Sequence, residues 1–170
     1  MRRLPAFLTA ALVTVAATAA TAATASAGDR VPVGNGEIFL PGAAFCGFDV
    51  DINPVEDNEF ATITTLADAT TITNVSGRFV ESYTNLATGK TITRNVSGPT
   101  TTTQRPDGTA TFVGAGNNRL IFGPRGRANT GEPALVITTG RVIVTFDGNV
   151  ATSFALAGRQ ENLCATRAAP

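Results

Sequence analysis

The chain has 170 residues, and its 13 basic and 13 acidic residues balance to a formal net charge of +0. It has no histidine and only two cysteines, which excludes Ser-His-Asp and Cys-His catalysis and zinc sites built from histidine or from cysteine alone. A near-neutral chain also lacks the basic surface by which proteins bind nucleic acid or anionic membranes.

Residues 1–27 have the three parts of a secretory signal peptide: a basic start, an apolar run and the cleavage sequence Ala-Ser-Ala at 25–27. We expect cleavage to leave a mature chain that begins at Gly28. No cysteine follows the cleavage site to carry a lipid, and no second apolar stretch approaches the ~20 residues that span a bilayer. The sequence therefore predicts a secreted, extracellular protein without a membrane span.

Residues 28–44 are expected to form an irregular N-terminal segment, residues 45–164 a single domain and residues 165–170 a short tail. In residues 45–52, apolar side chains alternate with glycine and aspartate, which predicts the first strand. Runs rich in Thr, Val, Ile and Phe, separated by turn sequences, predict further strands at 59–66, 70–75, 78–85, 90–97, 100–105, 109–113, 119–122, 135–139, 142–146 and 150–156. Residues 123–133 are expected to form an irregular loop, and helix is expected to be scarce.

Five glycines fall inside or between these runs, at positions 77, 98, 114, 140 and 158. Glycine within a strand marks a bulge or a bend, so neighbouring runs are expected to join into long, bent strands. The fold class that we expect is all-β, an antiparallel up-and-down β-barrel of about eight strands, because closure leaves no exposed sheet edge. A two-sheet β-sandwich that uses the same glycines as corners is the alternative.

The two cysteines lie near opposite ends of the expected domain. Cys46 is in the first expected strand, and Cys164 follows the last. Cysteines of secreted proteins usually pair, because the extracellular environment is oxidising. We therefore expect a Cys46–Cys164 disulfide that fastens the first strand to the last, where a barrel of this topology closes.

An acidic segment resembles the start of a calcium-binding loop. Residues 49–53 read Asp-x-Asp-x-Asn, but Pro54 stands where such a loop needs glycine and Phe60 where it needs glutamate. We interpret the segment as a solvated strand face that runs into an acidic turn, and assign no metal ligand. An irregular, weak calcium site between Asp49 and Asp57 is the alternative.

Glu81, Tyr83, Arg94 and Glu161 are the residues best suited to chemistry, although none is assigned a catalytic role. The turn sequence Ala-Thr-Gly at 87–89 predicts a hairpin in which Leu86 lies opposite Lys90. Continued along the strands, this register places Arg94 opposite Ser82, on the core face with Val80. Glu81 and Tyr83 would then lie on the other face of the sheet.

An arginine on a core face needs an acid or an anionic ligand as its partner. Arg94 is therefore the candidate ligand-pocket residue. The alternative is that its side chain extends to the rim of the barrel.

Several motifs resemble those of small secreted proteins of actinobacteria, namely FCGF at 45–48, TNLATGKT at 84–91, NVSGP at 95–99, FGP at 122–124 and TTGRV at 138–142. The resemblance covers most of residues 45–164. That family carries no assigned activity, so the resemblance implies no functional residue. Arg94 departs from the pattern, because an apolar residue is usual before Asn95.

These observations favour a non-catalytic secreted protein that binds a small apolar ligand or a surface partner, without a cofactor. The alternative is a barrel enzyme of the cyclase or lyase kind that uses arginine and carboxylates in place of histidine. An apolar cavity of about 300 Å³ or more would favour ligand binding, whereas an interior filled by side chains would favour a structural role or protein binding.

We predict that the secreted protein begins at or near Gly28, because small residues occupy the positions before the cleavage site. N-terminal sequencing of protein purified from culture medium checks this. Extracellular protein that retains Met1 or the apolar run would contradict it.

Overall fold

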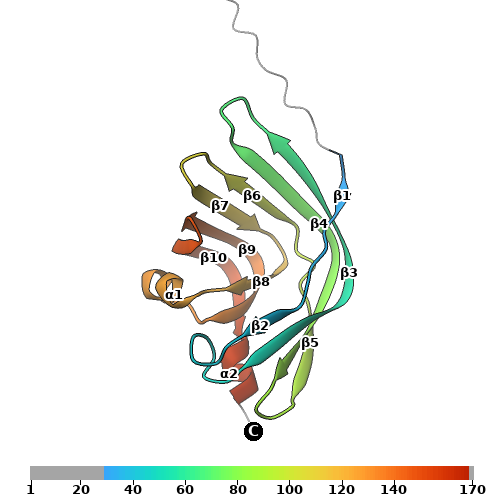
Figure 1. Cartoon of the computed structure of the whole chain (residues 1–170), viewed down its shortest axis with the longest axis vertical. Helices are drawn as coiled ribbons and strands as arrows, with labels where there is room; N and C mark the ends of the chain where they lie inside the picture. The colour runs from blue at the N-terminus through green and yellow to red at the C-terminus, as the bar shows by residue number, and fades with distance from the viewer. Residues whose placement is uncertain (1–28, 169–170) are drawn as a thin grey trace, which may run out of the picture.

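The structure is a computed structural model that describes residues 29–168, so the predicted signal peptide lies outside the described residues. This part of the chain forms one antiparallel sheet of ten strands with two short helices (Figure 1). The elements are β1 (Val31–Pro32), β2 (Ile38–Leu40), β3 (Val50–Thr65), β4 (Thr71–Asn85), β5 (Thr91–Asn95), β6 (Thr100–Gln104), β7 (Thr109–Gly114), β8 (Asn117–Ile121), α1 (Pro124–Thr130), β9 (Leu135–Asp147), β10 (Val150–Asn162) and α2 (Leu163–Ala168).

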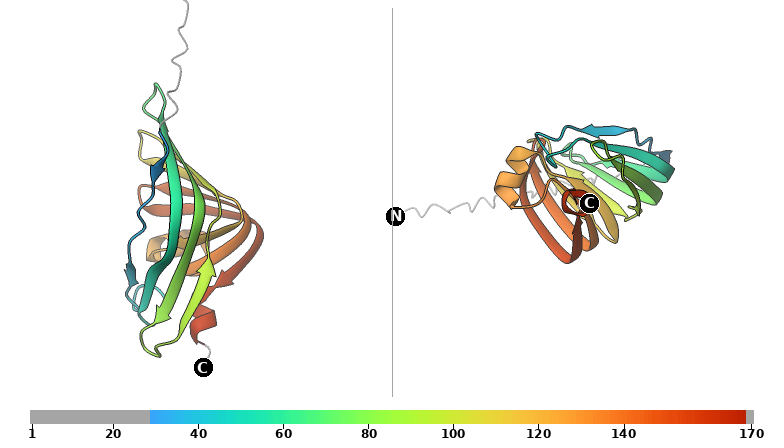
Figure 2. Two further views of the ribbon diagram at one scale, coloured as in Figure 1. Left: turned by 90° about the vertical axis from the view of Figure 1, so that its right-hand side faces the viewer. Right: turned by 90° about the horizontal axis from the view of Figure 1, so that it is seen from below.

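The chain runs back and forth through the sheet. β3 and β4 form a long hairpin; β4 then pairs with β5 along one part of its length and with β6 along another. β9 pairs in the same way with β7 and β8, and also with β10. β1 and β2 pair with the other edge of β3. Figure 2 shows that the resulting sheet is strongly curved.

The all-β, antiparallel class is confirmed, but closure of the sheet into a barrel is not shown. Within residues 29–168, the hydrogen-bonded order begins at β1 and ends at β10, and no pairing joins these two strands. A covalent bond instead connects the turn before β3 to the helix that follows β10. Cys46, in the turn before β3, and Cys164, in α2, form a disulfide with a Cα–Cα distance of 5.0 Å.

The disulfide links residues 118 positions apart in the sequence. In the chain-entropy model, closing a loop of about a hundred residues in the unfolded chain is worth about 4–5 kcal/mol to the folded state. Leu40 and Leu163 are buried in the core cluster against which both cysteines pack. The bond thus joins the two ends of the open sheet at its apolar core.

Three local expectations were wrong. The segment 28–44 contains β1 and β2, and the expected loop 123–133 contains α1. Proline at the start of α1 and Gly131 after its end, at φ 76°, are the residues that favour these positions. Residues 45–49 of the first expected strand lie in the turn before β3, and its remainder joins the strand expected at 59–66 to form β3, because a bulge between Pro54 and Glu56 accommodates the proline.

A row of glycines crosses the sheet, here called the glycine row: Gly77, Gly98, Gly116, Gly140 and Gly158. Gly77 lies level with Gly98, because β4 keeps one register with both β5 and β6. Gly140 pairs with Gly158 and donates its N–H to the carbonyl oxygen of Gly116 at 3.0 Å. On β3 the row ends at Glu59, which pairs with Gly77.

At every glycine of the row except Gly116, neighbouring backbones approach too closely for a side chain to fit. A Cβ at Gly158 would lie 1.9 Å from the carbonyl oxygen of Thr139, and a Cβ at Gly77 would lie 2.2 Å from that of Asn58. Gly77 also has a φ of 146°, which other residues rarely adopt. The row is therefore where the strands bend, as the sequence predicted for all of its members except Gly116.

Two apolar clusters form the core. One lies between β2–β4 on one side and β9 with α2 on the other, and comprises Leu40, Val50, Ile52, Phe79, Tyr83, Val96, Leu135, Ile137 and Leu163. The other comprises Leu120, Phe122, Val136, Val142, Val144 and Ala151. Leu135 and Ile137 belong to the first cluster and Val136 to the second. Since successive side chains of a strand point to opposite faces, the start of β9 is buried on both faces.

We predict that Gly77→Ala lowers the free energy of unfolding by about 2–4 kcal/mol, because the new Cβ adds both overpacking and backbone strain. Chemical denaturation measures the change. Gly34→Ala is the matched control, since its Cβ meets no atom within 4 Å. Equal stability of the two variants would contradict the role given to the glycine row.

Candidate functional site

Of the four residues singled out in the sequence, Tyr83 lies in the first core cluster and Glu81 is buried, and the expected hairpin register is wrong. Arg94 pairs with Glu81, not with Ser82, so it shares a face with Glu81. The reason lies in the turn. Asn85 donates its N–H to the carbonyl oxygen of Lys90, and its side-chain oxygen accepts the N–H of Ala87 at 2.9 Å, which makes the loop one residue longer than expected.

Glu81 is the centre of a buried polar cluster. Its side chain is 1 % exposed, and its Oε2 accepts a hydrogen bond from the Tyr83 hydroxyl at 2.7 Å. Its Oε1 accepts a short hydrogen bond from Arg119 Nη1. Burial raises the pKa of Glu81, and the charge of Arg119 and the hydroxyl of Tyr83 oppose that rise. The carboxyl thus has a partner for each oxygen, so the cluster holds β4 against β8.

Arg94 has a protein partner rather than an open anion site. Its Nε and Nη2 donate to Glu161 Oε2 and Oε1 at 2.9 and 2.6 Å, a two-point ion pair between β5 and β10. Each side chain is 33 % exposed. The hydrogen bond to Glu161 raises the pKa of Arg94. β5 pairs only with β4, and β8 pairs only with β9. The Arg94–Glu161 pair (β5 to β10) and the Glu81–Arg119 pair (β4 to β8) therefore each connect strands that are not hydrogen-bonded neighbours in the sheet.

Arg119, Glu59 and Asn35 are functional candidates that the sequence analysis did not single out. Arg119 and Glu59 each begin an expected strand, so neither stands out in the sequence. Asn35 lies in the segment expected to be irregular. Its Nδ2 donates to Glu59 Oε2 at 3.1 Å, and its backbone N–H donates to Asp57 Oδ2 at 2.9 Å.

A cavity of about 220 Å³, here called the row cavity, adjoins the glycine row. Its polar lining consists of Asn35, Glu59, Thr100, Asn118 and Arg119, and its apolar lining of Val75, Phe79, Val96 and Phe112, with Gly98. Glu59 is 8 % exposed. Burial is the largest effect that raises the pKa of Glu59; Asp57 and Glu81 raise it further.

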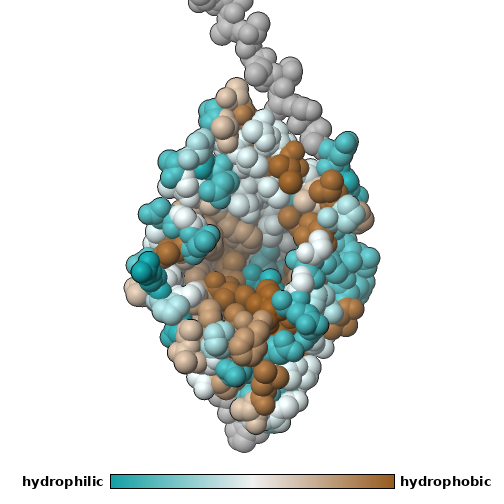
Figure 3. Space-filling model, in the orientation of Figure 1, coloured by the Kyte–Doolittle hydropathy of each residue, from teal (hydrophilic) through white to brown (hydrophobic). Residues whose placement is uncertain are grey.

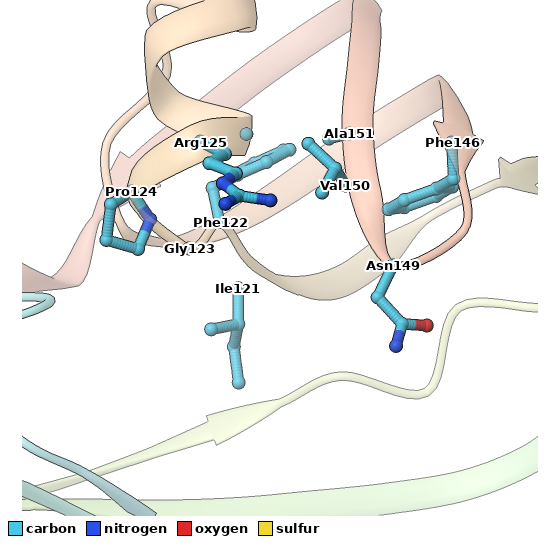
Figure 4. A pocket seen from close by; sticks show the side chains of 10 residues that line it. Ile121, Phe122, Gly123, Pro124, Arg125, Phe146, Asn149, Val150 and Ala151 are labelled. Carbon is cyan, nitrogen blue, oxygen red and sulfur yellow. The ribbon is translucent and has the colours of Figure 1, made fainter.

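A second cavity of about 370 Å³, here called the α1 cavity, lies between the start of α1 and the β9–β10 hairpin (Figure 4). Phe122, Phe146, Val150 and Ala151 form apolar walls, and the side chains of Arg125 and Asn149 come from its two sides. The remaining lining residues are Ile121, Gly123, Pro124 and Gly126. Figure 3 shows that the molecule is hollowed on the face turned to the viewer, with both apolar and polar surface in the hollow.

The acidic segment 49–57 lies before and along β3 rather than in a loop. Asp49 accepts the N–H of Gly42 at 2.7 Å, and Glu56 forms an ion pair with Arg78 at 2.6 Å. Within residues 29–168, no group of three or more acidic or cysteine side chains is placed to hold a metal ion. None of the helices described is long and apolar enough to cross a membrane.

No protein-family model, curated protein or solved structure matches this chain. The residues above are therefore interpreted from their own geometry.

We predict that Arg119→Met lowers the free energy of unfolding by about 3–5 kcal/mol near neutral pH, because Glu81 is left buried and unpaired. Loss of the arginine raises the folded-state pKa of Glu81 further. Stability should therefore fall as pH rises above 4.5, the ordinary value for this carboxyl, more steeply than in the parent protein.

Arg78→Met is the matched control, because it breaks an exposed ion pair with Glu56 and should cost no more than about 1 kcal/mol. Adding Glu81→Gln to Arg119→Met should restore part of the loss and flatten the pH dependence. Denaturant titrations at pH 4 to 8 measure both effects. A pH dependence unchanged by Arg119→Met would contradict the prediction.

Proposed function

We propose that the protein binds a small, mainly apolar ligand in the α1 cavity. The observation that carries this proposal is the cavity itself, at about 370 Å³ with mostly apolar walls. Binding pockets for small molecules are typically of about 300–1,000 Å³ and are lined by apolar and aromatic side chains with a few polar groups. Phe122 and Phe146 supply the aromatic walls.

The polar end of the ligand lies against Arg125 and Asn149 in this proposal. Within the described residues Arg125 makes no hydrogen bond or ion pair, and it is exposed at the edge of the cavity. A guanidinium in that position favours a ligand with a carboxylate, sulfonate or similar anionic group. Binding is proposed in preference to catalysis, since the residues best suited to chemistry are engaged within the protein: Arg94 is paired with Glu161, and Glu81 with Arg119 and Tyr83.

We also propose that the protein acts outside the cytoplasm, as its predicted signal peptide implies, with the curved sheet serving as the wall of a barrel. The disulfide supports both ideas. Such bonds persist in oxidising compartments, and this one joins the two ends of the sheet where strand pairing would otherwise close a barrel.

We predict that Val150→Trp weakens binding of the apolar probe N-phenyl-1-naphthylamine by at least about tenfold, because the indole fills the α1 cavity. Fluorescence titration of the probe measures the affinity. Gln160→Trp, an exposed position on the same strand, is the control and should leave it unchanged.

The anionic end is tested separately. Arg125→Gln should weaken the sulfonated probe 1-anilinonaphthalene-8-sulfonate several-fold while leaving the uncharged probe unaffected. The proposed function would be contradicted if every variant bound each probe as tightly as the parent protein does. It would also be contradicted if the parent protein showed no saturable binding.

A further inference from the structure

The row cavity is separate from the α1 cavity in its lining residues, and its chemistry is different. It contains a carboxyl group, Glu59, that is 8 % exposed and lines a space shared by polar and apolar side chains. Burying a carboxylate is costly unless it is paired with a cation or fully hydrogen-bonded. The partners of Glu59 therefore decide what this cavity can bind.

The hydrogen bonds of Glu59 are incomplete. Oε2 accepts a hydrogen bond from Asn35 Nδ2 at 3.1 Å, whereas Oε1 accepts none from residues 29–168. No ion pair within this part of the chain involves Glu59 either. An ionised carboxylate can accept several hydrogen bonds, so Oε1 has capacity for a donor supplied by a ligand.

The charges around Glu59 do not balance. Asp57 on the same strand and Glu81 on β4 disfavour its ionised form, and Arg119 on β8 favours it. Arg119, however, already donates to Glu81. Three carboxyl groups thus share one guanidinium at this end of the cavity, which favours a cationic ligand over an anionic one.

The rest of the cavity suits a hydrocarbon or aromatic group. Phe79 is 4 % exposed and Val96 is 6 % exposed, and Val75 and Phe112 complete the apolar lining. Aromatic faces also attract cations, which adds to the preference set by the carboxyl groups. A volume of about 220 Å³ is below the range of drug-sized pockets, so the ligand is compact.

We propose that the row cavity binds a small primary amine, with its ammonium group against Glu59 and its apolar or aromatic part between Phe79 and Phe112. The ammonium supplies the hydrogen-bond donor and the positive charge that Glu59 lacks. The site is independent of the ligand proposed for the α1 cavity.

Benzylamine is the probe, titrated into the mature protein at pH 7 and followed by the backbone amide NMR signals of the glycine row. Saturable shifts at Gly77 and Gly98 are expected. Glu59→Gln keeps the shape and the Asn35 contact but removes the charge, and should weaken binding by at least about tenfold. Glu56→Gln is the matched control, because Glu56 is paired outside the cavity with Arg78 and should change the affinity less than about twofold.

Uncharged and anionic probes of the same size test the class of ligand. Benzyl alcohol and benzoate should bind at least about tenfold more weakly than benzylamine. Affinity for benzylamine should rise as the pH is raised above 4.5, the ordinary pKa of this carboxyl, because the ammonium binds the ionised form of Glu59. Preference for benzoate or benzyl alcohol, or tighter binding at low pH, would overturn the proposal.

A second variant tests the position of the site in case Glu59→Gln fails to fold. Thr100→Phe, which fills the row cavity from β6, should abolish the shifts, whereas Val150→Trp in the α1 cavity should preserve them. Benzylamine binding that survives Thr100→Phe but is lost in Val150→Trp would place the amine in the other cavity and overturn the inference.

Discussion

The close approach of neighbouring backbones along the glycine row is the constraint on which the rest of the molecule depends. Gly140 and Gly158 are paired, and a Cβ at either would lie within 2.3 Å of a carbonyl oxygen of the other strand. A sheet of long strands without such a row would be flatter, because side chains on its concave face would keep the strands from bending. The bend brings β8 and β10 over β4 and β5.

The polar contacts between these strand layers are a consequence of that bend. Glu81 and Arg119 are 38 residues apart in the sequence, and Arg94 and Glu161 are 67 apart. The first pair is buried and the second half-exposed, so the first carries more of the specificity of the fold: misplacing either layer would leave a buried charge unpaired. The tyrosine hydroxyl completes the hydrogen bonding of Glu81.

Two of the cavities differ in their chemistry. The α1 cavity has mostly apolar walls and an arginine at its edge, which suits an apolar body with an anionic end. The row cavity has two aromatic side chains and a buried carboxyl group, Glu59, that forms no ion pair within the described residues, which suits an amine. The difference follows from Arg119: its hydrogen bond to Glu81 neutralises one carboxyl and leaves Glu59 uncompensated.

The candidate site was only partly predictable from the sequence. Glu81, Tyr83, Arg94 and Glu161 were recognised as residues suited to chemistry, and the Cys46–Cys164 pair was correctly predicted. Arg94 was correctly placed on the core face, but Glu81 and Tyr83 were placed on the other face, because a shift of one residue in a hairpin moves every side chain of one strand to the other side of the sheet. That shift came from the side chain of Asn85, which accepts hydrogen bonds within the turn.

The sequence by itself determined most of the longer strands from their β-branched runs, the turns between them, the bends at glycines and one disulfide, but not β1, β2 or α1. These follow from interactions between residues close in the sequence or from counting two cysteines. The tertiary structure decided which strands face each other, that the described sheet stays open, and that Arg119 pairs with Glu81 and leaves Glu59 without a cation. Those outcomes depend on how far each strand bends at the glycine row and on how these bends add up across the sheet. That is a property of the whole sheet and cannot be read from any single segment of the sequence.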